Sequence, residues 1–164
     1  GSLRRLAERY SLIRINNYKM KTDLTKILAI SGQSGLFLYI SATRTGAVVE
    51  ALADKKRSAV AATSKITSLA DISIYTDDEE GKLQQVFLNM KEVLGEDNAP
   101  SAKSAPEVLK ALFEKALPDY DRDRFYVSHM KKVVEWYNAL KKYASLDFVN
   151  PEEEAEETEA ADQE

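Results

Sequence analysis

Two kinds of hydrophobic periodicity divide the sequence near residue 76. Before this point, short apolar runs alternate with tight polar turns, a pattern typical of antiparallel strands joined by hairpins. After it, apolar residues recur every three or four positions, as they do on one face of amphipathic helices. The pattern therefore predicts an α+β protein in which the β-structure precedes the α-structure.

The first half is predicted to contain a short helix and several strands. Thr22 or Asp23 can cap a helix that ends at Ile30, before the glycine-containing loop 31–35, and one 3₁₀ turn is expected over 68–71. We expect this leading helix to plug a small SH3-like antiparallel β-barrel, because closing a sheet removes the edges that short strands leave open. The strands are expected at 36–42, 47–52, 57–63 and 72–76.

The second half is predicted to be an α-helical domain. Residues 76–79 match a capping box and predict the start of a first helix, which Gly95 would end. Pro106 suits the first turn of a second helix, and Ser128 can cap a third. The last two form a helical hairpin that is too small to bury its own apolar faces. The expected division is 22–77 for the barrel domain, 78–95 for a connecting helix, 96–105 for a linker and 106–149 for the helical domain.

Charge is distributed unevenly along the chain. The net charge is -4, but residues 150–164 hold eight acids and no base, whereas residues 1–19 hold five bases and one acid. The part between them is balanced and gives no overall bias towards nucleic acid. We expect 1–21 to be a tag and a weakly ordered extension, with Met20 as the natural start, and 150–164 to be a disordered acidic tail.

The composition excludes several kinds of site. The chain has no cysteine, which removes disulfides, thiolate nucleophiles and cysteine-based metal sites and suits a cytoplasmic protein. His129 is the only histidine, so a histidine metal site or a catalytic triad lacks a partner. The longest apolar runs are too short to cross a membrane. We expect no enzyme activity, no catalytic or metal-binding residue, no cofactor and no membrane association.

Three aspartates in the second half alternate as the first ligands of a calcium loop do. They are Asp119, Asp121 and Asp123, but Arg124 occupies the position of the loop's turn glycine. The interleaved Arg122 would also repel a cation. We therefore expect these acids to pair with the two arginines and to form a structural corner.

Several sequence phrases resemble a family of short, uncharacterised bacterial proteins. The first phrase begins Ile-Leu-Ala-Ile-Ser-Gly at 27–32, continues through 43–57 and closes with Leu-x-Asp-Ile-Ser-Ile-Tyr-Thr at 69–76. The second phrase is Leu-Pro-Asp-Tyr-Asp-Arg-Asp-Arg at 117–124, followed by Trp-Tyr-Asn at 136–138. The resemblance implies two successive domains of unknown function, and it carries over no catalytic residue.

Two surfaces are candidates for binding. Basic turns beside aromatic rings on the barrel are typical of proteins that hold phosphates and stack bases. Lysines that flank Trp136 on the last helix favour docking of a protein instead, with Trp136 as the anchor. We expect a non-enzymatic protein-interaction or regulatory module with an unidentified protein partner, and RNA or DNA binding is the alternative. The candidate nucleic-acid contacts are Arg44, Lys55, Lys56, Arg57, Phe37 and Tyr39, and the candidate docking residues are Trp136, Tyr137, Lys131 and Lys132.

Overall fold

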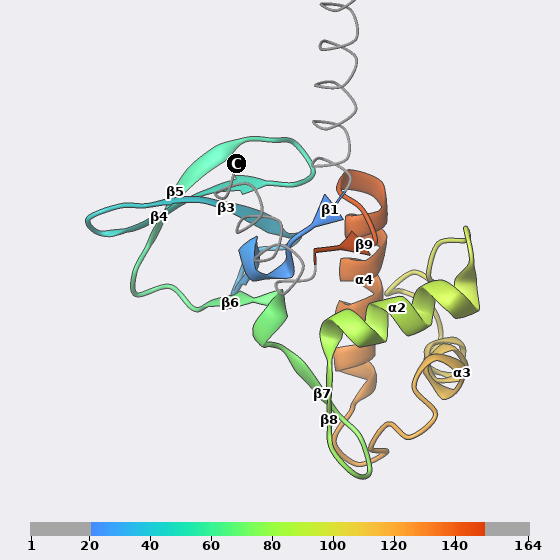
Figure 1. The fold of residues 1–164 in the computed structure, drawn as a ribbon. Helices are drawn as coiled ribbons and strands as arrows, with labels where there is room; N and C mark the ends of the chain where they lie inside the picture. The colour runs from blue at the N-terminus through green and yellow to red at the C-terminus, as the bar shows by residue number, and fades with distance from the viewer. Residues whose placement is uncertain (1–20, 150–164) are drawn as a thin grey trace, which may run out of the picture.

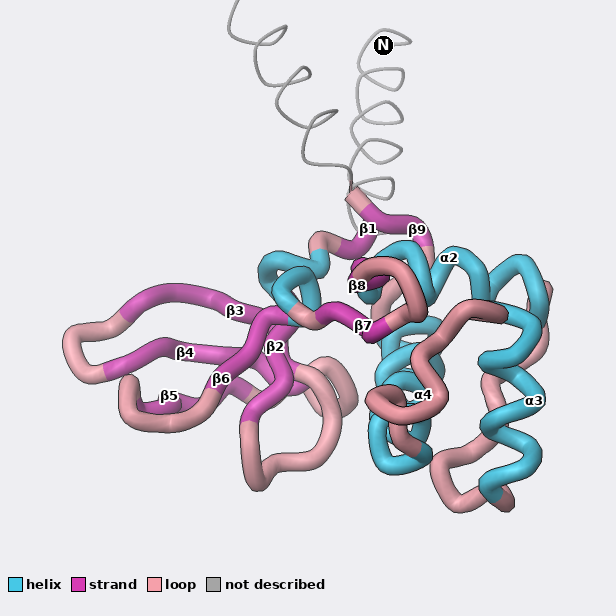
Figure 2. The backbone as a smooth tube through the Cα atoms, turned by 90° about the horizontal axis from the view of Figure 1, so that it is seen from below, coloured by secondary structure: helices cyan, strands magenta, loops and turns pink. Residues whose placement is uncertain are grey.

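The computed structural model describes residues 21–149, which form a curved β-sheet and a group of three helices side by side (Figure 1). A second view shows the large sheet to one side, whereas the short strands at 21–22, 73–75, 80–82 and 147–148 lie beside the helices (Figure 2). The expectations for 1–20 and 150–164 lie outside the described residues. The elements are β1 (Lys21–Thr22), a 3₁₀ turn (Leu24–Lys26), β2 (Ile27–Ile30), β3 (Phe37–Ala42), β4 (Gly46–Ala51), β5 (Arg57–Ala61), β6 (Ile66–Ser68), a second 3₁₀ turn (Leu69–Asp71), β7 (Ser73–Tyr75), β8 (Glu80–Lys82), α2 (Leu83–Leu94), α3 (Pro106–Ala116), α4 (Val127–Tyr143) and β9 (Asp147–Phe148).

Five strands form one antiparallel sheet in the order β5-β4-β3-β2-β6. Its inner face buries a small apolar cluster around Val49, which also contains Leu28, Phe37 and Val60. The two edge strands, β5 and β6, do not pair with each other within the described part of the chain. The α+β class is therefore confirmed, but the prediction of a closed SH3-like barrel is wrong. The sheet is curved around its small apolar cluster, and within residues 21–149 its edge strands remain unpaired with each other.

The predicted leading helix is also wrong. Asp23 does cap, since its Oδ1 accepts a hydrogen bond from the Thr25 N–H at 3.0 Å, but it begins only a three-residue 3₁₀ turn. Residues Ile27–Ile30 then continue as β2, which pairs with β3 on one side and β6 on the other. A short apolar run fits a buried helix and a central strand equally well, and the pairing on both edges decides between them.

The strand expected to close the barrel belongs to a separate hairpin. β7 pairs with β8, and β6 takes the outer place in the large sheet beside β2. Thr76 Oγ1 accepts a hydrogen bond from the Glu79 N–H at 3.0 Å, which is the contact of a capping box, but here the contact closes the hairpin turn. The helix expected over 78–95 therefore begins only with α2 at Leu83, and Gly95 ends it as predicted.

The helical hairpin packs on α2, through α3 and through the contact of Tyr137 on α4 with Phe87. Pro106 begins α3, whereas α4 starts at Val127 with Tyr126 as its N-cap residue, so the predicted cap at Ser128 is wrong. The Tyr126 N–H donates to His129 Nδ1 at 3.3 Å, so the side chain of the third helical residue accepts from the N-cap backbone, as a glutamate does in a capping box. None of the helices in residues 21–149 combines the length and the apolar character needed to span a membrane.

The helices and one end of the sheet share a single large core. Leu24, Ile27 and Leu69 belong to the same buried cluster as Phe87 and Tyr137. The two ends of the described chain also meet, because β1 runs parallel to β9 and pairs with it. The expected domain boundary at residue 77 falls within the turn between β7 and β8, at a place where packing is continuous.

Asn138 on α4 holds the connection between α2 and α3 in place. Its Oδ1 accepts from the Ala99 N–H at 2.8 Å, and its Nδ2 donates to the Ala99 carbonyl at 3.0 Å. Because Ala99 is buried, Asn138→Ala leaves two backbone groups unpaired, and we expect it to lower the free energy of unfolding by about 2–3 kcal/mol. Urea denaturation measures the change, with Lys142→Ala on the same helix as the control. A loss no larger than in the control would contradict this role.

Candidate functional site

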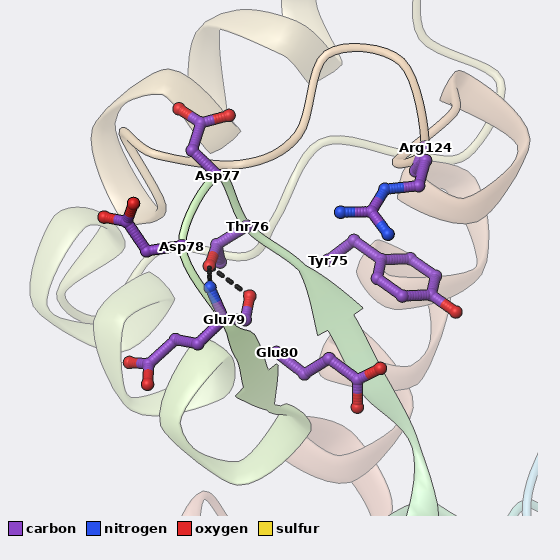
Figure 3. Close-up of a pocket in the computed structure, with 7 residues that line it drawn as sticks. All are labelled: Tyr75, Thr76, Asp77, Asp78, Glu79, Glu80 and Arg124. Atoms are coloured by element: carbon purple, nitrogen blue, oxygen red, sulfur yellow. Dashed lines mark hydrogen bonds between the residues drawn. The ribbon is translucent and has the colours of Figure 1, made fainter.

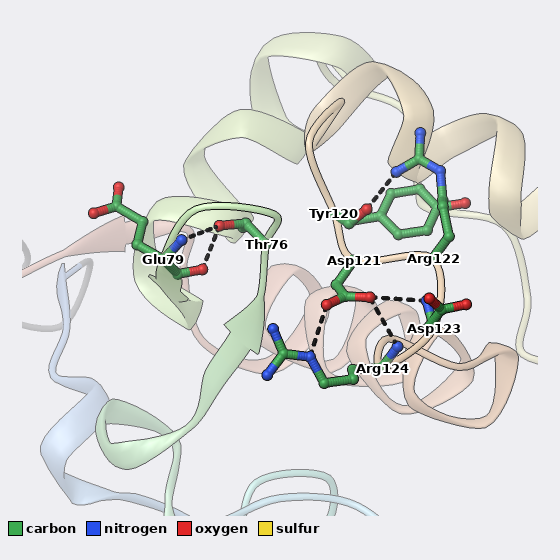
Figure 4. A network of polar contacts seen from close by, with 7 residues as sticks. All are labelled: Thr76, Glu79, Tyr120, Asp121, Arg122, Asp123 and Arg124. Atoms are coloured by element: carbon green, nitrogen blue, oxygen red, sulfur yellow. Dashed lines mark hydrogen bonds and ion pairs between the residues drawn. The ribbon is translucent and has the colours of Figure 1, made fainter.

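The segment 117–124 folds into a corner against the β7–β8 hairpin (Figure 4). Asp121 organises it: Oδ2 pairs with Arg124 Nε at 2.7 Å, and Oδ1 accepts from the Asp123 N–H at 2.8 Å. The Asp121 N–H in turn donates to the Tyr75 carbonyl at 2.9 Å, which ties the corner to β7. The predicted structural corner is thus present, and the pairing of an aspartate with Arg124 is confirmed.

Arg122 differs from the prediction, because it does not pair with an aspartate. Its guanidinium lies 3.6 Å from the centroid of the Tyr120 ring and donates to the carbonyls of Tyr120 and Pro118. Arg122 therefore closes the corner through backbone oxygens and a cation–π contact.

Low pH should reduce the contribution of Asp121 to the stability of the fold. The hydrogen bond from Arg124 and the one from the Asp123 N–H lower the pKa of Asp121 below its ordinary value of 3.8. A carboxyl group whose pKa is lower in the folded chain stabilises the fold above its unfolded pKa, and this stabilisation is lost as the pH falls through the folded pKa. We expect Asp121→Asn to be less stable than the wild type at neutral pH, with a difference that shrinks below about pH 4. Thermal unfolding of both proteins at several pH values measures this difference, and a difference that does not change with pH would contradict the expectation.

Arg124 stands between two hollows of the surface. Its guanidinium lies 4.3 Å from the centroid of the Tyr75 ring. The first hollow, about 140 Å³, lies over the β7–β8 turn and is bordered by four acids, whose side chains point in different directions (Figure 3). Within residues 21–149, no group of three or more acids or histidines is arranged to hold a metal ion. We therefore assign no ligand to this hollow.

The second hollow is a groove of about 280 Å³ between β7 and the first half of α4, called the β7–α4 groove below. Its floor is apolar, with Phe125 and Val133 buried and Trp136 partly buried. The exposed side chains of Arg124, His129 and Lys132 stand on its rim, and no carboxylate lines it; Arg124 is paired with Asp121 behind the rim, whereas Lys132 forms no ion pair within residues 21–149. The groove is lined by 72–75, Arg124, Phe125, His129, Lys132, Val133 and Trp136.

The structure brings two of the four predicted docking residues into this groove. Trp136 and Lys132 line it, and Lys131 is exposed outside the lining. Tyr137 is fully buried against Phe87, and its hydroxyl has no hydrogen-bond partner among the described residues. Burial accordingly raises the pKa of Tyr137. Tyr137 is therefore a core residue and offers no surface to a partner.

The predicted nucleic-acid contacts do not gather on one face. Tyr39 pairs with Val49 across the sheet, whereas Arg57 pairs with Glu50 and forms an ion pair with it at 3.2 Å. Because successive residues of a strand point to opposite faces, Tyr39 and Arg57 lie on opposite faces of the sheet. Phe37 is buried in the core. RNA or DNA binding remains a prediction for which the fold assembles no common surface.

The basic turns are separated as well. Arg44 lies in the turn between β3 and β4, whereas Lys55 and Lys56 lie in the turn between β4 and β5. These turns stand at opposite ends of β4, a six-residue strand, so about 20 Å separates them. The two turns therefore do not form one compact basic patch.

The comparisons with known proteins agree with the family resemblance. Residues 24–69 match the domain of unknown function DUF5606, and residues 72–140 match the domain of unknown function DUF6852. The second match contains the whole lining of the β7–α4 groove.

A protein from Bacteroides vulgatus, solved by solution NMR as a target of the Northeast Structural Genomics Consortium, is 39% identical in sequence. The similarity covers 71% of this chain and 84% of that chain, with a TM-score of 0.60. No curated protein matches the sequence. The chain therefore belongs to the uncharacterised family in which DUF5606 is followed by DUF6852.

Proposed function

We propose that this protein is a non-enzymatic interaction module, active in the cytoplasm, that binds another protein in the β7–α4 groove. The observation that carries the proposal is the position of Trp136 in the groove, partly exposed beside an apolar floor and beneath a cationic rim. Tryptophan, tyrosine and arginine dominate the binding energy of protein interfaces, and this groove has one of each.

The side chains of the groove favour binding over catalysis. His129 is the only imidazole in the lining of the groove, and its Nδ1 already accepts from the Tyr126 N–H. No carboxylate of the groove orients the imidazole, as a general base usually requires. The hydroxyls of Ser73 and Tyr75 thus lack an activating partner within the lining.

Affinity isolation with a matched control tests the proposal. The full chain, the groove variant Lys132→Glu/Trp136→Ala and the control Lys110→Glu/Lys115→Glu on exposed positions of α3 serve as baits in nuclease-treated lysate of the native host. We expect one protein to be enriched at least tenfold on the wild type and the control and to be lost from the groove variant. Equal recovery on all three baits would contradict the proposal, and so would binding that nuclease removes.

A further inference from the structure

We propose that the β7–α4 groove takes an extended acidic peptide of a partner protein, which adds to the free edge of β7 as a new strand. The inference rests on the function proposed above and names the chemical class of the partner. Addition of a strand to an exposed sheet edge is a common way to bind peptides, because the main chain supplies affinity and side-chain pockets supply specificity.

The groove follows the edge of β7. Four consecutive residues, 72–75, line it. Successive side chains of a strand point to opposite faces, so a groove that contacts all four residues runs along the strand edge, where backbone groups are presented. The opposite edge of β7 is occupied by β8.

The strand register identifies the free backbone groups. The Leu83 N–H donates to the Ile72 carbonyl at 3.2 Å, and the Thr76 N–H donates to the Glu79 carbonyl at 2.9 Å. Antiparallel pairs alternate between bonded and non-bonded residues, so Ser73 and Tyr75 direct their N–H and C=O groups away from β8. The Tyr75 carbonyl accepts from Asp121, but in residues 21–149 the Ser73 N–H and C=O and the Tyr75 N–H find no partner.

The corner formed by 117–124 already occupies the C-terminal end of the same edge, beside Tyr75 and Thr76. Tyr120 forms an antiparallel bridge with Thr76, and the Asp77 N–H donates to the Asp119 carbonyl at 2.9 Å. After Asp121 the chain turns away, and the place beside Ser73 is open to the groove. An extended peptide here continues a ladder that the protein has begun itself.

The rim defines the chemistry of the peptide. Lys132 and Arg124 face it and no acid lines the groove; Arg124 pairs with Asp121 only through Nε, so its terminal nitrogens and the Lys132 ammonium can meet carboxylates of the peptide. The apolar floor around Phe125 and Trp136 requires an apolar side chain between these carboxylates. The chain's own segment 150–164 is acidic, but Thr158 is its single β-branched residue and it has no aromatic one. Such a composition disfavours a strand, which points to a partner protein as the source.

Amide hydrogen exchange distinguishes strand addition from other binding in the groove. Heptapeptides selected from a random displayed library on the immobilised full chain serve as probes, and we expect acids flanking a β-branched or aromatic residue. On saturation with such a peptide, the amide of Ser73 should exchange at least tenfold more slowly, whereas the Ile74 amide, already paired with β8, should not change. Slower amide exchange around Trp136 without protection of the β7 edge would overturn strand addition, but it would leave the proposed function standing. A library that yields no peptide for the groove would also overturn this inference. The proposed function would still stand if affinity isolation had identified a protein partner.

A matched pair of variants tests the backbone contact directly. Ser73→Ala keeps the N–H and should bind the selected peptide with a Kd within twofold of the wild type. Ser73→Pro removes the N–H at an edge position where proline is tolerated, and should weaken binding at least tenfold. If thermal unfolding shows that the proline variant does not fold, two N-methylated forms of the selected peptide replace it. One form is methylated at the odd residues and the other at the even residues, and one of the two should bind at least tenfold more weakly than the unmethylated peptide. Unchanged binding of the folded proline variant, or of both N-methylated forms, would contradict strand addition.

Discussion

Replacing Gly46 by alanine is expected to lower the free energy of unfolding by about 3 kcal/mol or more, at the upper end of the cost of overpacking. A Cβ at this position would lie 1.8 Å from the Val60 carbonyl oxygen and 2.9 Å from the Ala62 nitrogen. Both atoms belong to the backbone of β5 and the turn after it, so no side-chain rotation relieves the clash. Since Gly46 pairs with Ala61, any side chain must push the two strands apart.

Urea denaturation followed by circular dichroism measures this loss. Gly81→Ala is the matched control, because Gly81 also lies in a strand pair but its Cβ would meet only the Ile74 carbonyl oxygen at 3.7 Å and Thr76 Cγ2 at 3.8 Å. We expect the control to change stability by less than about 1 kcal/mol. Similar values for the two variants would show that β5 does not approach Gly46 so closely.

Replacing Phe87 by alanine is expected to cost about 3–5 kcal/mol and to destabilise both halves of the protein. Phe87 is fully buried on α2, with ring centroids 6.2 Å from Tyr137 on α4 and 6.0 Å from Phe148 on β9. The same buried cluster includes Leu24 and Leu69 from the first half. A cavity at Phe87 therefore weakens a core to which sheet and helices both contribute.

Two probes separate this expectation from independent unfolding of the halves. Trp136 fluorescence reports on the helices, and the methyl resonances of Val49 report on the inner face of the sheet. In Phe87→Ala both urea midpoints should move down together. Val93→Ala, at a position 39% exposed on the same helix, should leave both within about 0.5 kcal/mol of the wild type. A Val49 transition that stays at the wild-type midpoint would contradict a shared core.

Features set by neighbouring residues were predictable from the sequence. The 3₁₀ turn at Leu69–Asp71, the stop at Gly95 and the start of α3 at Pro106 all appear where expected. Each depends on a cap, a positive φ or a missing N–H within a few positions. Features set by distant strands were not predictable. Thr76 makes the same hydrogen bond in a hairpin turn that it would make in a helix cap, and only the pairing of β7 with β8 decides between them.

The candidate site shows the same division. Trp136 and Lys132 were identified because lysines flank Trp136 on the last helix, but Tyr75 and Arg124 come from segments whose contact no local pattern predicts. One sequence signal did point to both segments. They are the ends of the two phrases that carry the family resemblance, at Thr76 and at Arg124, and these ends contact each other in the fold. The positions of the candidate nucleic-acid contacts were not predictable for a related reason, because the register that places Tyr39 and Arg57 on opposite faces depends on cross-strand pairing.

Site-specific photocrosslinking tests the central claim, that a partner protein docks in the β7–α4 groove, most directly. p-Benzoylphenylalanine is placed at Lys132, on the rim of the groove, or at Glu114, an exposed position of α3, in the full chain within its native host. We predict one discrete adduct from Lys132, absent when Trp136→Ala is added, and no such adduct from Glu114. An identical adduct from both positions, or none from Lys132 in cells where the protein is abundant, would contradict the claim.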